Sequence, residues 1–153
     1  VVPLGRRRQV AQPGVLLVAD QAQIAECVEN ATRQGIDARH GETLQGQVYE
    51  IGQQFKAHHD HFMKGSIYWE DMMKQGGQRS WTAMIYLNEP AAGGETEFPI
   101  AGMTVTPRRA MLLLWNNMQP DGTPNPATLH ASLPVKAGTK YIVTKWFREK
   151  FWV

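Results

Sequence analysis

The chain has 153 residues, of which 42% are hydrophobic, and its formal net charge is +2. This length and composition predict a folded domain with its own core and argue against disorder. The small net charge argues against nucleic-acid binding, and no apolar run approaches the length of a membrane span, so we expect neither kind of partner. Cys27 is the only cysteine, so the chain forms no internal disulfide, and we expect a cytoplasmic location.

The first third of the chain contains one predicted strand and one predicted helix. A short apolar run over 14–19 predicts a buried strand. Asp20 is a suitable N-cap for a helix over 21–33, which has three apolar side chains on one stripe. We expect residues 1–42 to support a core formed by residues 43–150, within a single domain.

From residue 43 onward the pattern predicts β-structure. The strand candidates are 43–51, 56–60, 79–88, 95–98, 102–106, 110–116, 128–133 and 139–148. Turn residues separate most of these segments, and no helix is predicted between them. The pattern therefore predicts a mainly β fold with an N-terminal helix, namely a double-stranded β-helix, or jelly roll. The segment 61–78 is long for a hairpin connection and is interpreted as a lid, or else as a surface loop.

Three of the five histidines, and one carboxylate, lie close together in the stretch FKAHHDHF, residues 55–62. Alternation along a strand would place His58 and Asp60 on one face and His59 on the other. His130 is the candidate for a third ligand. Two histidines and one carboxylate form the facial triad of non-haem Fe(II) oxygenases, which leaves coordination positions open. Zinc accepts the same ligands, so a non-catalytic, cupin-like metal-binding module is the alternative.

A lysine is predicted to point into the interior of the β-structure. On the last strand candidate Lys140 shares a face with Ile142 and Thr144, and a buried lysine is costly unless an anion meets it. A dicarboxylate co-substrate would supply that anion, whereas a zinc module has no need of the cation. Tyr49 and Tyr86 are possible hydroxyl donors, each contributing about 1.5–3 kcal/mol to a charged partner. Taken singly, each tyrosine is better explained as a core aromatic with a hydrated hydroxyl.

Five blocks with characteristic internal spacing occur in order along the chain. They are Tyr49-x-x-Gly52-Gln53-x-Phe55-x-x-His58-x-Asp60-x-Phe62, Gly76-Gly77-Gln78-Arg79, Tyr86-Leu87, Gly93-Gly94-Glu95-Thr96-x-Phe98-Pro99 and His130-x-x-x-Pro134-Val135-x-x-Gly138-x-Lys140-x-x-x-x-x-Trp146. The series resembles the prolyl 4-hydroxylases, in the collagen and plant-type branch of the 2-oxoglutarate- and Fe(II)-dependent dioxygenases. The resemblance extends from Glu42 to Arg148.

The resemblance implies a role for each matching residue. His58, Asp60 and His130 match the iron ligands, and Lys140 matches the lysine that pairs with the far carboxylate of 2-oxoglutarate. The other matches are co-substrate residues (Tyr49, Tyr86, Thr96), a tryptophan beside the site (Trp146) and peptide contacts (Glu42, Arg79). The implied cofactors are Fe(II), 2-oxoglutarate, O2 and ascorbate.

The implied reaction is hydroxylation of a prolyl residue, at the 4-position, in a peptide or protein. The same oxygenase chemistry on a non-prolyl target or a free small molecule is the alternative. Tyr68, Trp69 and Trp81 would line a groove for the peptide, or else they are core and rim residues. The chain departs from the family pattern at Phe55, where tyrosine is common, and His59 and His61 are interpreted as structural or rim residues.

Overall fold

The structure is a computed structural model that describes residues 37–153 together with the backbone of one earlier strand, β1 (Val15–Ala19). The predicted strand over 14–19 is therefore confirmed as β1. The predicted helix over 21–33 lies outside the described residues. No helix among the described residues is long and apolar enough to cross a membrane.

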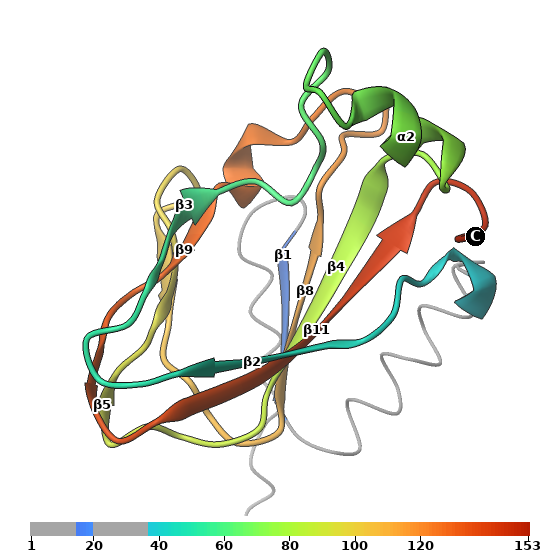
Figure 1. Cartoon of the computed structure of the whole chain (residues 1–153). Coiled ribbons are helices and arrows are strands. Elements are labelled where there is room, and N and C mark those ends of the chain that lie inside the picture. Colours follow the sequence, from blue (N-terminus) through green and yellow to red (C-terminus); the bar gives the residue numbers. More distant parts are fainter. Residues whose placement is uncertain (1–14, 20–36) are drawn as a thin grey trace, which may run out of the picture.

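Two antiparallel sheets form the body of the molecule (Figure 1). The larger sheet has the order β1, β8 (Met111–Asn116), β4 (Arg79–Tyr86), β11 (Lys140–Arg148) and β2 (Gln45–Tyr49). The smaller sheet has the order β3 (Phe55–His58), β9 (His130–Ser132), β6 (Thr96–Phe98) and β7 (Met103–Val105). A separate two-stranded sheet pairs β10 (Val135–Ala137) with β5 (Ala92–Gly93). This arrangement confirms the predicted jelly roll.

The core lies between the larger and the smaller sheet, and its residues follow the alternation of side chains along their strands. On β4 the inward residues Thr82, Met84 and Tyr86 are buried, while the residues between them are only half-buried. Phe98 of the smaller sheet packs edge-on against Trp115 of the larger sheet, with ring centroids 5.5 Å apart. Burial of such aromatic rings is a large contribution to the stability of a sandwich core.

Several elements differ from the sequence prediction. The segment 61–78 contains a short helix, α2 (Trp69–Lys74), and β3 ends at His58 rather than at residue 60. Strands β5 and β10 were missed because they lie between turn residues, β5 before Gly94 and β10 between Pro134 and Gly138. Gly93 makes their pairing possible, since its φ is 77° and an added Cβ would lie 2.4 Å from the Pro134 carbonyl oxygen.

Two short 3₁₀ helices complete the described structure. One, η1 (Ala38–His40), precedes β2, and the other, η2 (Pro126–Thr128), immediately precedes the strand that begins at His130. The Asn125 side chain accepts a hydrogen bond from the Ala127 amide and caps η2. The capped turn therefore fixes the approach of the chain to β9.

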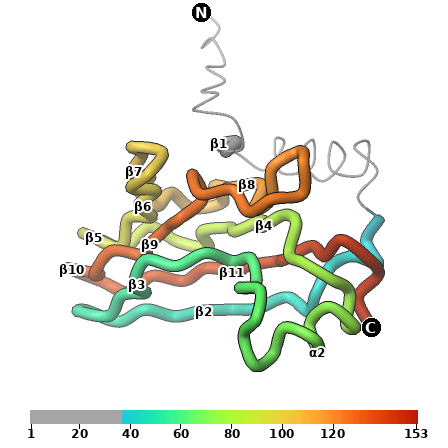
Figure 2. Tube along the Cα trace, turned by 90° about the horizontal axis from the view of Figure 1, so that it is seen from above, coloured from blue at the N-terminus to red at the C-terminus, as the bar shows by residue number. Residues whose placement is uncertain are grey.

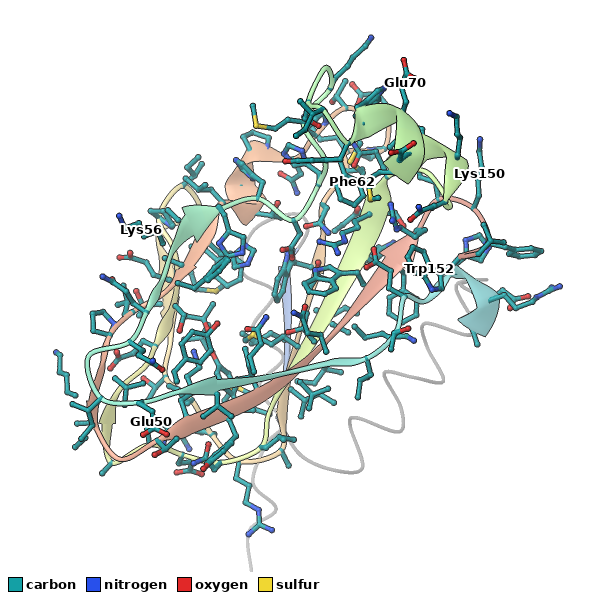
Figure 3. The ribbon with its side chains drawn as sticks, in the orientation of Figure 1. Glu50, Lys56, Phe62, Glu70, Lys150 and Trp152 are labelled. Atoms are coloured by element: carbon teal, nitrogen blue, oxygen red, sulfur yellow. The ribbon has the colours of Figure 1, made fainter. Side chains whose placement is uncertain are left out.

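Helix α2 lies at the same end of the molecule as the C-terminus (Figures 1 and 2). Figure 3 shows Lys56, Glu70 and Lys150 pointing outward, whereas Phe62 lies near α2. The Gln78 side chain donates to the Phe62 carbonyl and accepts from the Phe62 amide, both at 2.8 Å. These two bonds attach the start of the 61–78 segment to the beginning of β4.

Candidate active site

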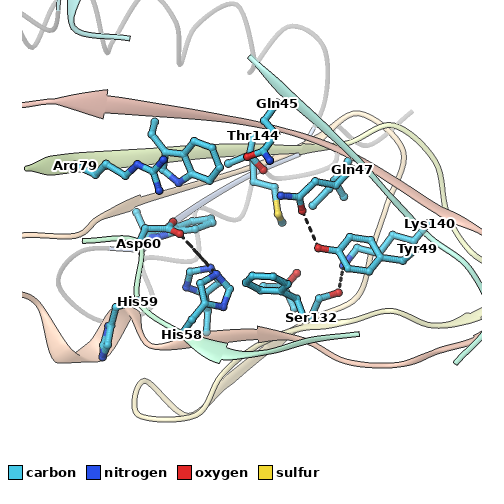
Figure 4. A pocket seen from close by; sticks show the side chains of 17 residues that line it. Gln45, Gln47, Tyr49, His58, His59, Asp60, Arg79, Ser132, Lys140 and Thr144 are labelled. Atoms are coloured by element: carbon cyan, nitrogen blue, oxygen red, sulfur yellow. Dashed lines mark hydrogen bonds and ion pairs between the residues drawn. The ribbon is translucent and has the colours of Figure 1, made fainter. Parts of the chain in front are cut away.

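Three potential metal ligands converge at one end of the smaller sheet. His58, Asp60 and His130 each offer a ligand atom, and these atoms all lie within 4.8 Å of one another. Asp60 Oδ1 is 3.7 Å from His58 Nε2 and 3.9 Å from His130 Nε2. The predicted triad is therefore assembled in the fold (Figure 4).

The two histidine rings are held with the same nitrogen facing the cluster. His58 Nδ1 lies 2.8 Å from the Lys56 carbonyl oxygen, and His130 Nδ1 lies 2.9 Å from the Thr128 carbonyl oxygen. A carbonyl only accepts, so each Nδ1 carries a proton and each Nε2 is the ring nitrogen directed toward the cluster. Burial lowers the pKa of His130, which favours the neutral ring that binds metals.

Asp60 reaches the cluster from a bend and not from a strand. Because β3 ends at His58, alternation along a strand does not explain why the two side chains meet. Thr82 of the facing sheet donates a hydrogen bond of 2.7 Å to Asp60 Oδ2. The carboxylate is thus directed by a contact between the sheets, which local sequence patterns do not reveal.

A cavity of about 300 Å³ lies between the sheets and contains the cluster. The residues that line it are Gln45, Gln47, Tyr49, Phe55, His58, His59, Asp60, Arg79, Met84, Thr96, Trp115, His130, Ser132, Lys140, Ile142, Thr144 and Trp146. Paired positions on β2 and β11 form one wall, with Tyr49 opposite Lys140 and Gln45 opposite Thr144. Lys140 is fully buried whereas Phe55 is 49% exposed, so the cavity has a closed end and an open end.

The closed end holds a cation without a counterion. Lys140 Nζ donates to Ser132 Oγ at 2.7 Å, and no carboxylate among residues 37–153 forms a salt bridge with it. Burial lowers the pKa of Lys140 from 10.5 to about 8, although the charge of Glu95 opposes this shift. The ring centroids of Tyr49 and Tyr86 lie 5.2 and 5.4 Å from Nζ. An anion entering this end would stabilise the charged form of the lysine and raise its pKa again.

Of the predicted co-substrate residues, Tyr49 and Thr96 line the cavity and Tyr86 does not. Tyr49 lines the cavity, and its hydroxyl donates to Gln47 Oε1 at 2.7 Å (Figure 4). Tyr86 is not among the lining residues, and its hydroxyl donates to Thr96 Oγ1 at 2.5 Å. The Tyr86 hydroxyl therefore contacts Thr96, which does line the cavity, and a direct contact of Tyr86 with the co-substrate stays a prediction. Burial raises the pKa of both phenols.

The two predicted peptide-contacting residues form an ion pair. Arg79 binds Glu42 through two hydrogen bonds, at 2.7 and 2.8 Å, and Arg148 Nε lies 2.7 Å from the same carboxylate. Arg79 lines the cavity, but Glu42 is buried and does not. Two guanidinium groups hold the Glu42 carboxylate, so Glu42 supports Arg79, and a direct contact of Glu42 with a peptide stays a prediction.

Trp146 lines the cavity beside this ion pair. The Arg79 guanidinium carbon lies 3.9 Å from the Trp146 ring centroid, within cation–π range. The three aromatic residues expected to line a peptide groove, Tyr68, Trp69 and Trp81, are not among the lining residues. Trp81 precedes the inward Thr82 on β4 and therefore faces the other side of the sheet.

His59 contributes little to the interior of the cavity. Figure 4 shows its ring at the rim, directed away from Asp60 and His58. It packs instead against His61, with ring centroids 4.7 Å apart. This geometry agrees with the prediction that both residues are structural or rim residues.

Sequence reasoning missed several cavity residues that a period of two would have found. Gln45 and Gln47 alternate with Tyr49 on β2, and Ser132 lies two positions after His130 on β9. Each shares a face with a residue that was singled out. Arg148, by contrast, carries no local signal, because its contact with Glu42 joins segments distant in the sequence.

A jelly roll with two histidines, one carboxylate and a buried lysine around one cavity defines a class of protein. The ligand set is the one used by non-haem Fe(II) oxygenases, and the donor atoms fit such a metal because each His Nε2 and Asp60 Oδ1 is free of protein hydrogen bonds. Residues 44–148 match the family model of the 2OG-Fe(II) oxygenase superfamily. The chain belongs to this superfamily, whose cofactors are Fe(II), 2-oxoglutarate and O2.

Curated relatives show which members of the superfamily this chain is similar to. The chain is 36% identical over 131 residues to prolyl 4-hydroxylase 5 of Arabidopsis thaliana, covering 73% of this chain and 43% of that protein. It is 34% identical over 118 residues to prolyl 4-hydroxylase subunit alpha-1 of Gallus gallus, covering 76% of this chain and 22% of that protein. The chain thus spans less than half the length of these two relatives.

A solved structure shows the same fold over most of the chain. The viral collagen prolyl hydroxylase of Paramecium Bursaria Chlorella virus-1, in its 2OG complex, superposes with a TM-score of 0.66 at 27% identity. The match covers 88% of this chain and 78% of that chain. A Pseudomonas putida prolyl-4-hydroxylase, at 22% identity and a TM-score of 0.53, has the same fold over 84% of this chain and 63% of its own.

Proposed function

We propose that this protein hydroxylates a prolyl residue, at the 4-position, in a peptide or protein substrate. The observation that carries the proposal is the arrangement of charge in one cavity. The triad of His58, Asp60 and His130 lies beside the path between Lys140 at the closed end and Arg79 nearer the open end. The relatives that match most of this chain are prolyl 4-hydroxylases, which supports the choice of substrate.

The closed end suits the co-substrate. Lys140 provides a positive charge, Tyr49 a hydroxyl and Thr96 a second hydroxyl within one buried pocket. A charge-assisted hydrogen bond to a carboxylate contributes about 1.5–3 kcal/mol, and it is stronger where water is excluded. The far carboxylate of 2-oxoglutarate would displace the Tyr49 hydroxyl from Gln47 and the Lys140 ammonium from Ser132.

The open end suits an extended peptide. Arg79 is held by Glu42 and by the Trp146 ring, so two of its three nitrogens point in a fixed direction. The third nitrogen remains for a carbonyl acceptor of the substrate. A polyproline II segment suits such a site because it is extended before it binds and presents its carbonyl groups outward.

In the proposed reaction the protein holds the metal and the substrates in place and excludes water. His58, His130 and Asp60 would hold Fe(II) on one face, which leaves the opposite face to 2-oxoglutarate and O2. With these partners bound, the metal centre supplies the oxidising power that a C–H hydroxylation needs. The chain orients the co-substrate through Lys140, places the target carbon through Arg79 and keeps water from the closed end.

The test combines two measurements on purified protein with Fe(II), 2-oxoglutarate and air. A proline-rich peptide should gain one oxygen atom by mass spectrometry while an equivalent amount of succinate is formed. The same peptide with alanine in place of proline should gain none. Lys140→Met should abolish turnover, and Lys136→Met, at an exposed position on β10, should retain it.

Two other outcomes would decide against the proposal. Succinate formation that depends on a free amino acid or another metabolite would assign the same oxygenase chemistry to a non-prolyl target. No consumption of 2-oxoglutarate, with zinc bound tightly, would identify a metal-binding module. We include ascorbate in the proposal as the reductant that keeps the iron ferrous, and its omission should shorten the period of linear turnover.

A further inference from the structure

The two oxygens of Asp60 have different partners, and this difference has a structural cause. Oδ1 faces the histidine nitrogens, at 3.7 and 3.9 Å. Oδ2 accepts a hydrogen bond of 2.7 Å from Thr82 Oγ1. Only one carboxylate oxygen is therefore presented to the metal site.

The direction of the Thr82 hydroxyl proton is set by a further residue. Asn117, which follows the last residue of β8, donates from Nδ2 to Thr82 Oγ1 at 2.8 Å. An amide nitrogen only donates, so the threonine oxygen is the acceptor in this bond. The single hydroxyl proton is then left for Asp60. A reversed Asn117 amide would take that proton and leave Asp60 Oδ2 without a donor.

The residues that form this chain of hydrogen bonds are buried, and their backbone is held in place. Thr82 and Asn117 are each 0% exposed, and Asp60 is 6% exposed. The Asn117 backbone is fixed on both sides, because its N–H donates to the Ser80 carbonyl and its carbonyl accepts from the Asn125 N–H. Thr82 belongs to β4, whose pairing with β8 sets its distance from Asn117. Because Thr82 and Asn117 are fully buried, solvent is a poor replacement for a lost donor.

We propose that Thr82, oriented by Asn117, is a positioning residue that holds Asp60 as a one-oxygen ligand. A six-coordinate Fe(II) that takes three protein atoms and two co-substrate atoms has one position left for O2. A carboxylate free to rotate would bind through both oxygens and occupy one of the positions that the co-substrate or O2 requires, so that Fe(II) would be held less tightly when 2-oxoglutarate is present. Thr82 prevents this by engaging Oδ2. The inference rests on the proposed iron centre and adds how its geometry is maintained.

The experiment measures metal binding and does not depend on any peptide substrate. Fe(II) dissociation constants are determined anaerobically by calorimetry, with 2-oxoglutarate present, for the wild type, Thr82→Val, Thr82→Ser and Asn117→Ala. Loss of an outer partner of a metal ligand weakens affinity by roughly 10–100-fold. We expect Thr82→Val to show a loss in that range, Thr82→Ser to bind within about threefold of the wild type, and Asn117→Ala to show a smaller loss of the same sign.

Thr82→Val is isosteric, and urea unfolding of the metal-free proteins checks that it folds. Thr82→Ser keeps the hydroxyl but removes a methyl group, so it separates hydrogen bonding from packing. Equal Fe(II) affinity in the wild type and Thr82→Val would overturn the inference, as would a Thr82→Ser protein as weak as Thr82→Val. If the wild type itself binds no Fe(II), the proposed iron centre fails, and that result is distinct from either of these.

Discussion

Lys140→Met should stabilise the protein in the absence of 2-oxoglutarate, although it removes the residue that we propose binds the co-substrate. Burial lowers the pKa of Lys140 from 10.5 to about 8. At about 1.36 kcal/mol for each pKa unit, the folded state at pH 7 is about 3 kcal/mol less stable than it would be without this buried charge. Losing the hydrogen bond to Ser132 costs about 1 kcal/mol, so we expect a net gain of about 2 kcal/mol.

The gain should depend on pH with a definite sign. Below pH 8 the lysine is protonated in both the folded and the unfolded chain, so the burial cost is present in full. Between about 8 and 10.5 the folded state releases the proton while the unfolded state keeps it, and wild-type stability rises relative to the variant. The difference between the two proteins should therefore shrink over this range and lose its pKa component above it.

Urea unfolding at several pH values, with linear extrapolation, measures this difference. Lys136→Met is the matched control, because its ammonium group is exposed and should give a change within about 0.5 kcal/mol. Added 2-oxoglutarate at about 100 times its Kd should stabilise the wild type by about 2.7 kcal/mol and leave the variant unchanged. A Lys140→Met protein less stable than the wild type at pH 7, or a difference that does not vary with pH, would refute the reasoning.

Four further outcomes follow from the site. His130→Ala should abolish Fe(II) binding in anaerobic calorimetry, and wild-type affinity would remove this residue from the ligand set. The Kd for 2-oxoglutarate should rise about tenfold per pH unit above the Lys140 pKa of about 8, and a flat profile up to about pH 10 would contradict the pairing. Arg79→Met should raise the KM for peptide by roughly 10–100-fold while the KM for 2-oxoglutarate stays constant. Gln47→Leu frees the Tyr49 hydroxyl and should lower the KM for 2-oxoglutarate about fivefold, with the Fe(II) Kd unaltered.

The parts of the fold that sequence reasoning predicted are those with local signals. A period of two along β4 and β11 places Thr82 and Lys140 on inward faces, and both side chains are buried in the structure. Turn residues separate the longer strands, so their existence was predictable even where their ends were not. Strands β5 and β10 lie in stretches of turn residues, between Pro90 and Gly94 and between Pro134 and Gly138, which is why they were missed.

The parts that were not predicted depend on contacts between distant segments. No pattern in the sequence around Glu42 predicts that Arg79 and Arg148 both contact its carboxylate. Its position in the motif series suggested a direct peptide contact, whereas the structure makes it the support for Arg79. Tyr86 was similarly assigned to the cavity from the correct face of its strand, but Thr96 stands in front of its hydroxyl.

In the proposed function one fold serves two chemically different partners, and the register of β2 against β11 would set the spacing of their binding regions. Tyr49 is opposite Lys140, at the buried end of the pair. Gln45 is opposite Thr144, four residues further along β11 toward the open end. Side chains on one face of a strand advance about 6.6–6.8 Å every two residues, so the wall separates the anion-binding end from the peptide-binding end by a fixed spacing. A slip of one residue in this register would turn Lys140 to the outer face. The pairing of these two strands, rather than any single residue, therefore sets the distance between the two binding regions.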